Sequence, residues 1–415
     1  MRSRLSIVLR DGKPGRRWGL ALSALILAAV SVTTATRPVA ARAATLTCNQ
    51  TWQIVSSPNP SGSGDDLSGV ASVSATDAWA VGGAGNAPFI TRWDGNSWTQ
   101  VSVPQVGYAD VLYAVAASSD TNAWAVGYYA PSATGPSFTL TYHWDGSSWS
   151  YIPSPNGGTD TNNLVAVTTG HGTFAVGYSI TNPNYATLAL RYTSQGWVRT
   201  PTPNLGTFGQ MDLTGVGGMS DGTALAVGTG ETFGGGSIAN VLSWDGHSWS
   251  VLESPQFPDD SLAALSVAPS TSEAMAVGID SSSAPFSAHR SSSGTWSTST
   301  VTLPAGRVGG LLGVASVRPG AWAVGWTSPA DYSSQIALTA RWDGTTWHVV
   351  PSPNPSHGTQ ASLSSVSSAG GTTWAVGGYR GGAGRVPNTD RGVLLGGLSG
   401  RAIRRSGRVR YHRRR

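Results

Sequence analysis

The chain has 415 residues, of which 40% are hydrophobic and only 11% are charged, and it contains 54 Gly, 24 Pro and 17 Trp. Such a composition favours a β-rich protein with many turns over a helical cytosolic enzyme. Basic residues are concentrated at the two ends, so residues 44–400 hold ten arginines against twenty Asp plus Glu, a net charge of about −10. This balance argues against nucleic-acid binding by the body of the chain.

Residues 1–43 have the pattern of a secretory signal peptide. A basic start ends at Arg16-Arg17, an apolar run covers residues 19–32, and small-residue cleavage sites precede residues 42 and 44. The run is shorter than the roughly 20 residues of a membrane span, although a retained anchor stays an alternative. We predict a secreted protein that uses Sec export rather than the twin-arginine route. Cys48 is the only cysteine, so no intramolecular disulfide forms.

A short apolar segment of the form X-Ala-Val-Gly occurs seven times along the chain. The copies begin at Trp79, Trp124, Phe174, Leu225, Met275, Trp322 and Trp374, with spacings of 45, 50, 51, 50, 47 and 52 residues. A repeat of this length is one supersecondary unit that must stack on its neighbours to bury a core.

The second repeat shows the unit most clearly, because turn signals separate four apolar runs at residues 111–118, 123–127, 138–144 and 149–152. Runs of this kind predict four strands. The turn before the last strand recurs as Trp-Asp-Gly-x-x-Trp at residues 93–98, 144–149, 244–249 and 342–347. Asp-Gly supplies the left-handed backbone of a tight hairpin, and the flanking tryptophans can pair across the two strands.

The last repeat lacks this hairpin, and its fourth strand is expected at the other end of the body. Residues 51–60 match residues 346–355, including the series Thr-Trp and Pro-Asn-Pro. We therefore predict an all-β, seven-bladed β-propeller over residues 44–400, with four antiparallel strands per blade and the N-terminal strand completing the last blade. Such closure removes the exposed edge of a linear array.

The repeats resemble those of secreted bacterial seven-bladed β-propellers. The Asp-Gly-x-Ser-Trp hairpin looks like the Asp-box of BNR (sialidase-type) repeats, except that Gly follows Asp directly instead of two residues later. Glycine-rich blades with a late tryptophan are also similar to Kelch and galactose-oxidase propellers. The resemblance implies an architecture and little chemistry.

Sequence signals for catalysis are weak. Cys48 precedes the first strand, which argues against the cysteine–tyrosine copper site of galactose oxidase. The arginines of the body form no recognisable sialidase triad, and Arg92 and Arg341 stand at equivalent repeat positions, which indicates a structural role. We find no zinc spacing, phosphate-binding glycine loop or serine-nucleophile elbow. A non-enzymatic protein is favoured, while a lyase or hydrolase with its site at the channel mouth stays open.

Candidate binding residues lie just after the X-Ala-Val-Gly segments, in loops that vary between repeats. The predicted aromatic ligand-binding residues are Tyr128, Tyr129, Tyr178, Trp326 and Tyr379, with Tyr185 and Tyr332 further along. Exposed rings can stack on the apolar faces of sugars, and variable loops on a rigid scaffold often carry binding. Packing between blades is the alternative role of these rings.

A second set of polar residues precedes the first strand of each blade, at Asp66, Asp110, Asn163, Asp212 and Asp260. If the first strand is innermost, these residues would surround one mouth of the central channel. They could bind ligand hydroxyls or a calcium ion, the one metal or cofactor that the sequence suggests. Their alternative role is to accept hydrogen bonds from free N–H groups in turns.

The last fifteen residues are rich in arginine and are predicted to be disordered. The candidate residues for binding an anionic polymer are Arg404, Arg405, Arg408, Arg410, Arg413, Arg414 and Arg415. A terminal extension without function is the alternative.

The function predicted from sequence is a secreted, monomeric, lectin-like propeller that binds an extracellular glycan or surface protein through loops on one face. The alternatives are a polysaccharide-directed lyase or hydrolase and a protein-interaction scaffold.

Overall fold

The computed structural model describes residues 52–61, 65–203, 211–231, 237–252, 260–268, 270–317, 320–354, 358–381 and 391–399. All of them belong to one of the two units of the chain, Cys48–Arg415. The predicted signal peptide (residues 1–43) and arginine-rich tail (residues 401–415) lie outside the described residues. In the described part of the chain, no helix has the length and apolar character needed to cross a bilayer.

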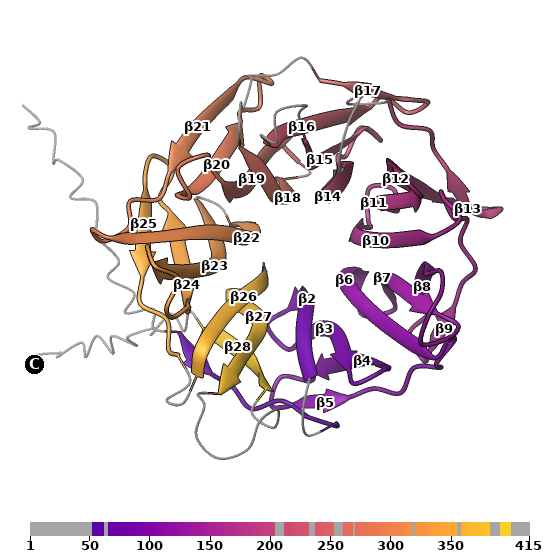
Figure 1. Cartoon of the computed structure of the whole chain (residues 1–415), viewed down its shortest axis with the longest axis horizontal. Coiled ribbons are helices and arrows are strands. Elements are labelled where there is room, and N and C mark those ends of the chain that lie inside the picture. The colour runs from indigo at the N-terminus through magenta and orange to yellow at the C-terminus, as the bar shows by residue number, and fades with distance from the viewer. Residues whose placement is uncertain are drawn as a thin grey trace, which may run out of the picture. The chain divides into compact units, whose positions relative to one another are not determined.

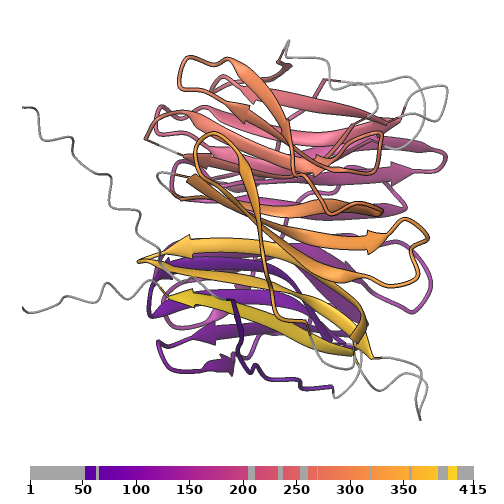
Figure 2. The same ribbon diagram turned by 90° about the vertical axis from the view of Figure 1, so that its left-hand side faces the viewer.

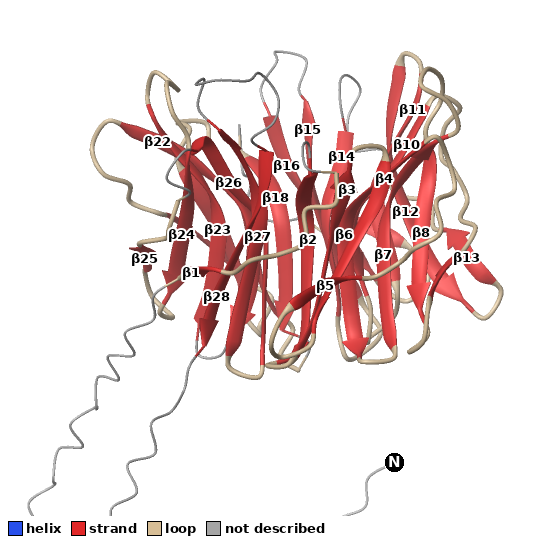
Figure 3. Ribbon diagram, turned by 90° about the horizontal axis from the view of Figure 1, so that it is seen from below, coloured by secondary structure: helices blue, strands red, loops and turns tan. Residues whose placement is uncertain are grey.

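The strands of the described residues form seven four-stranded antiparallel sheets, arranged as blades around a common axis (Figure 1). Figures 2 and 3 show the same blades from the side. The predicted all-β propeller with four antiparallel strands per blade is thereby confirmed.

The first strand of each blade lies nearest the axis (Figure 1). These inner strands are β2 (Asp65–Ser74), β6 (Ala109–Ser119), β10 (Thr161–Thr168), β14 (Met211–Gly218), β18 (Ser261–Ala268), β22 (Arg307–Val317) and β26 (Gly358–Ala369). The second strands are β3 (Asp77–Ala84), β7 (Asn122–Ala130), β11 (Phe174–Thr181), β15 (Ala224–Glu231), β19 (Glu273–Ile279), β23 (Gly320–Pro329) and β27 (Thr372–Gly381).

The third and fourth strands complete each blade toward the rim. The third strands are β4 (Ala87–Trp93), β8 (Phe138–Trp144), β12 (Asn184–Thr193), β16 (Ser237–Trp244), β20 (Pro285–Arg290), β24 (Ile336–Trp342) and β28 (Arg391–Ser399). The fourth strands are β5 (Trp98–Gln100), β9 (Trp149–Tyr151), β13 (Gly196–Arg199), β17 (Trp249–Val251), β21 (Trp296–Thr300), β25 (Trp347–Val350) and β1 (Gln53–Ile54).

The N-terminal strand β1 completes the last blade, as the sequence match predicts. Its residues Gln53 and Ile54 pair with β28 in an antiparallel register. Trp52 stands beside this strand and meets Trp322 of the preceding blade edge to face, with ring centroids 5.4 Å apart. The two ends of the repeat array therefore share one blade, and the sheet that contains the last repeat gains its outer strand from the other end of the body.

The first residue of each X-Ala-Val-Gly segment is a contact between blades. The Trp79 ring is fully buried and lies 4.9 and 5.1 Å from the rings of Trp144 and Trp149 in the next blade. The same contact recurs as Trp124 on Trp197, Phe174 on Trp249 and Trp374 on Trp98. Burying a ring of this size contributes about 2–3 kcal/mol, so these contacts hold the blades together.

Arginines on the third strands cover the same aromatic contacts. The Arg92 guanidinium lies 4.7 Å from the centroid of the Trp79 ring and donates two hydrogen bonds to Asp77, at 2.8 and 3.1 Å. Arg341 stands in the same way 5.9 Å from Trp322. The structural role predicted for Arg92 and Arg341 is confirmed, because both sit over a buried indole of their own blade.

The glycine that ends each X-Ala-Val-Gly segment is required by the neighbouring inner strand. A Cβ placed on Gly82 would lie 2.0 Å from the carbonyl oxygen of Asp66. Equivalent Cβ atoms on the six other glycines would lie 1.8–2.0 Å from a carbonyl oxygen: Gly127, Gly177, Gly228, Gly278, Gly325 and Gly377. The inner strand carries a β-bulge beside each of these sites, as between Leu67 and Gly69, which brings its backbone close.

The two adjacent glycines of the first blade allow a matched test. We expect Gly82→Ala to destabilise the propeller by about 1–3 kcal/mol or more, because the new methyl group overlaps backbone atoms that cannot move independently. Gly83→Ala should cost less than about 0.5 kcal/mol, since its Cβ would meet only Asp66 Oδ1, at 3.6 Å. Urea unfolding measures both, and equal losses would contradict the role assigned to the bulge.

The aspartate of the Trp-Asp-Gly hairpin organises its turn. Asp145 Oδ1 accepts hydrogen bonds from the backbone N–H groups of Ser147 and Ser148, at 2.8 and 2.9 Å. The Ser147 hydroxyl donates a third bond, and this hydrogen bond and those from the two N–H groups lower the pKa of Asp145 to about 2. The paired tryptophans predicted to flank this turn are confirmed, with the Trp144 and Trp149 rings 5.9 Å apart.

A pH series tests this turn. The folded-state pKa of Asp145 lies below its ordinary value of 3.8, so its contribution to stability is complete above pH 4 and is lost as the pH falls toward 2. Asp145→Asn keeps an acceptor oxygen but does not titrate. We expect the melting-temperature advantage of the wild type over this variant at pH 6 to shrink between pH 4 and pH 2; an advantage that stays constant would rule out this titration.

Candidate functional site

One face of the propeller carries the loops between second and third strands together with the loops between blades; we call it the upper face. Both sets of predicted site residues lie where strands meet these loops. Because the strands are paired residue by residue, the register decides which of the predicted side chains share a side.

The predicted aromatics divide into two groups by register. Tyr128 pairs with Val111, Tyr178 with Asn163 and Trp326 with Gly310, so these three rings hold equivalent positions in their blades. Tyr129 and Tyr379 follow one residue later and therefore face the opposite side of their strands. Tyr129 packs against Phe138 and Tyr151, with ring centroids 5.4 and 6.3 Å away. For Tyr129, the alternative role of packing against neighbouring rings is the observed one.

The five predicted polar residues do not form one ring around the channel. Asp66, Asn163 and Asp212 stand one residue before the buried leucine of their inner strands, whereas Asp110 and Asp260 stand two residues before it. Alternation places these two groups on opposite sides of the strands.

Asp110 fixes the loop that leads into its own blade. Its carboxylate is fully buried and accepts the backbone N–H groups of Val106 and Gly107, at 2.6 and 2.8 Å. The Tyr142 hydroxyl donates its proton to the Pro104 carbonyl oxygen and lies 3.3 Å from the same carboxylate. Asn162 repeats the arrangement one blade later, where Oδ1 accepts two backbone N–H groups at 2.8 Å. Asp110 therefore has the alternative role, in which the carboxylate accepts hydrogen bonds from free N–H groups of a turn.

Removing this carboxylate should reduce stability. We expect Asp110→Ala to lower the free energy of unfolding by about 2–3 kcal/mol, because two buried N–H groups lose their acceptor. Tyr142→Phe removes only one donor and should cost about 1 kcal/mol. Chemical denaturation of both variants checks the order, and a cost for Asp110→Ala below that of Tyr142→Phe would contradict the role assigned to the Asp110 carboxylate.

A cluster of tyrosine, aspartate and asparagine side chains spans the first four blades; we call it the tyrosine arc and define it as Tyr113, Tyr128, Tyr178 and Tyr185 with Asp66, Asn163 and Asp212. The rings of Tyr113 and Tyr128 lie 5.8 Å apart. Burial raises the pKa of Tyr113 most, and Tyr128, Tyr178 and the Asp66 charge raise it further. Side chains of the first three blades thus lie close enough to interact.

The arc ends in a crevice between the third and fourth blades. A pocket of about 160 Å³ is lined by Tyr178, Ile180, Tyr185, Met211 and Asp212. Asn163 Nδ2 donates a 2.7 Å hydrogen bond to the Tyr178 hydroxyl, which fixes the ring beside the pocket. Burial raises the pKa of Tyr178, and the Asp212 charge and Tyr185 raise it further.

Asp212 is a largely buried carboxyl group of the arc with a raised pKa. Burial raises its pKa, although hydrogen bonds from the Thr229 N–H and its own backbone N–H oppose the shift. A carboxyl group with a raised pKa beside a tyrosine in a crevice is typical of functional sites. It can accept hydrogen bonds from ligand hydroxyls or, when protonated, donate one.

The other predicted residues lie outside the arc. The Trp326 ring lies in the sixth blade, where its centroid is 6.2 Å from that of Tyr332. Tyr379 lines a second pocket, between the last and first blades. Asp260 accepts a hydrogen bond from the Ser281 N–H at 3.3 Å. The arginines proposed to bind anionic polymers lie outside the described residues.

Tyr113 is a functional candidate that the sequence reasoning missed. It occupies the bulge between Leu112 and Ala114 in β6, where the register shift changes the direction of a side chain. The only sequence signal was an aromatic residue in an inner strand.

Among the described residues, no group of three or more His, Cys, Asp or Glu side chains is placed to hold a metal ion. The calcium hypothesis stays a prediction, without a ligand set of that kind in this part of the chain.

Comparison with known proteins supports the fold alone. No family model and no curated protein matches the chain. The WD40 β-propeller domain of Doa1 matches with a TM-score of 0.51 and 12% identity, over 84% of this chain and 97% of that one. YCF48 from Cyanidioschyzon merolae matches with a TM-score of 0.48 and 17% identity, over 83% and 98%. YCF48 bound to D1 peptide gives 0.48 and 13%, over 84% and 96%.

Proposed function

We propose that this protein is a secreted, lectin-like propeller that binds an extracellular glycan at the tyrosine arc. The observation that carries the proposal is the convergence of Tyr128, Tyr178 and Tyr185 with Asp212 at the upper face, from three different blades. Tyrosine rings offer an apolar face for the C–H side of a sugar ring. Carboxylate and amide groups beside them accept and donate hydrogen bonds to the hydroxyl groups.

The side chains of the tyrosine arc are held in place by their neighbours, which supports a role in ligand binding. Tyr178 is held by Asn163 at 2.7 Å, and Tyr113 is wedged against Tyr128. Side chains fixed before the ligand arrives lose little conformational entropy on binding. A site built on strand ends also holds its geometry better than one built on loops alone.

The test is a glycan array of neutral oligosaccharides followed by calorimetry with the strongest hit. We expect Tyr178→Ala and Tyr128→Ala each to weaken binding at least tenfold, because each removes a stacking surface. Tyr108→Ala is the matched control, since this tyrosine is 52% exposed and is not part of the arc. An array without hits, or variants that bind as tightly as the wild type, would refute the proposal.

A catalytic role for the same crevice is a second candidate, favoured by the raised pKa of Asp212 beside Tyr178. A polysaccharide lyase or hydrolase would use such a carboxyl group in proton transfer. Release of reducing ends from polysaccharides by the wild type, lost in Asp212→Asn while binding persists, would establish this role. A protein-interaction scaffold stays the other alternative, for which capture of a defined partner by the upper face is the test.

A further inference from the structure

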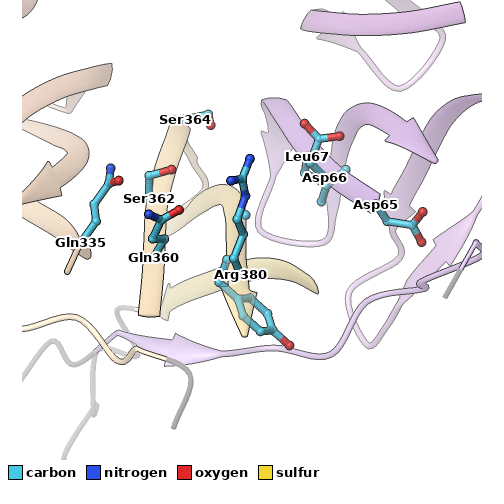
Figure 4. Close-up of a pocket in the computed structure, with 10 residues that line it drawn as sticks. Asp65, Asp66, Leu67, Gln335, Gln360, Ser362, Ser364 and Arg380 are labelled. Atoms are coloured by element: carbon cyan, nitrogen blue, oxygen red, sulfur yellow. The ribbon is translucent and has the colours of Figure 1, made fainter. Parts of the chain in front are cut away.

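A second, larger pocket lies where the last blade meets the first. It encloses about 390 Å³, within the range of about 300–1,000 Å³ common to small-ligand sites. Its lining is formed by Asp65, Asp66, Leu67, Gln335, Gln360, Ser362, Ser364, Gly378, Tyr379 and Arg380. Figure 4 shows the polar side chains of Gln335, Gln360, Ser362 and Ser364 on one side of Arg380 and Asp66 on the other.

Small residues in the last blade create this space. Gly378 pairs with Ser362, at the position where the second and third blades carry Tyr128 and Tyr178. Ser364 occupies the bulge that Tyr113 fills in the second blade. The last blade therefore lacks the rings that the second and third blades carry at these positions.

Register directs Arg380 toward this pocket. Arg380 pairs with Gln360, two residues beyond Gly378 on the same strand, so the two residues share the side that lines the pocket. Tyr379 lies between them on the strand and also lines the pocket. The Arg380 side chain stands between the glutamine and serine side chains and Asp66 (Figure 4).

Arg380 is available for an anion. Within the described residues it makes no ion pair or hydrogen bond, and its side chain is exposed. Asp65, which also lines the pocket, does not pair with Arg380. Its side chain is buried, at 1% exposed, and accepts a 3.0 Å hydrogen bond from the Ser61 N–H. A guanidinium group presents planar paired donors that match a carboxylate.

The wall opposite the arginine is fixed by backbone pairing. The Ala361 N–H donates a 2.9 Å hydrogen bond to the Gln335 carbonyl, which joins a loop of the sixth blade to β26. Gln335 and Gln360 form a parallel bridge at the same place. Amides and hydroxyls of this wall can bind hydroxyl groups of a ligand whose acid group lies on Arg380.

We propose that this pocket binds an acidic sugar unit, a uronate, with its carboxylate on Arg380 and its hydroxyl groups on Ser362, Ser364 and the two glutamines. The choice of a sugar acid rests on the proposed glycan-binding function, while the anion site rests on Arg380 and the pocket alone. Asp66, across the pocket, disfavours a second negative charge and limits the site to one carboxylate.

The experiment compares trigalacturonate with its fully methyl-esterified form, which keeps the hydroxyl groups and loses the charges. Calorimetry should show that the wild type binds the acid at least tenfold more tightly than the ester. Arg380→Gln should remove this preference, and Arg380→Lys should restore only part of it, because a lysine lacks the paired donors. Asp66→Asn removes a charge of the opposite sign from the same pocket, and this variant should bind the acid at least as tightly as the wild type.

The outcomes separate this proposal from the previous one. Tyr178→Ala should leave the preference for the acid unchanged, whereas Arg380→Gln should leave neutral-glycan binding unchanged. Equal binding of acid and ester by the wild type, or no binding of either, overturns the uronate site. A preference that survives Arg380→Gln overturns it as well. Loss of neutral-glycan binding alone affects only the tyrosine arc.

Discussion

The propeller depends on one repeated contact, in which the first residue of each X-Ala-Val-Gly segment packs against the next blade. A single four-stranded blade cannot bury both of its faces, so each blade is stable only between two neighbours. Trp79 on Trp144 and Trp149 shows the contact in full. Arg92 covers the outer side of this contact, which leaves the inner and upper ends of the blades free for other roles.

The upper face is where the repeats stop being equivalent. Each crevice between blades has the same backbone, fixed by the glycine of the segment and the bulge of the inner strand. Two positions in each of these blades, the bulge of the inner strand and the residue after the segment, decide what the crevice holds. Large rings at these positions give the tyrosine arc, as at Tyr113 and Tyr178, while Ser364 and Gly378 leave an open pocket beneath Arg380. One scaffold can thus present two chemically different sites.

The sequence indicated where the site lies, but not which side chains form it. The positions after each segment were identified, and Tyr128 and Tyr178 do lie together. Tyr129 was predicted to bind ligand because it follows Tyr128 directly. Asp110 was predicted to do so because it is an aspartate before an inner strand, like Asp66 and Asp212. A shift of one residue moves a strand side chain to the opposite face, so Tyr129 packs in the core and Asp110 binds its own loop.

The sequence by itself determined the blade architecture, because the period of the apolar segments and the hairpin signals are local in the chain. It also determined the closure, through the match between residues 51–60 and 346–355, which β1 and β28 bear out. Only the tertiary structure decided which side chains meet across blades. The bulges reset the alternation within each inner strand, and contacts such as Tyr113 with Tyr128, or the opening above Gly378, depend on that register and on neighbouring blades.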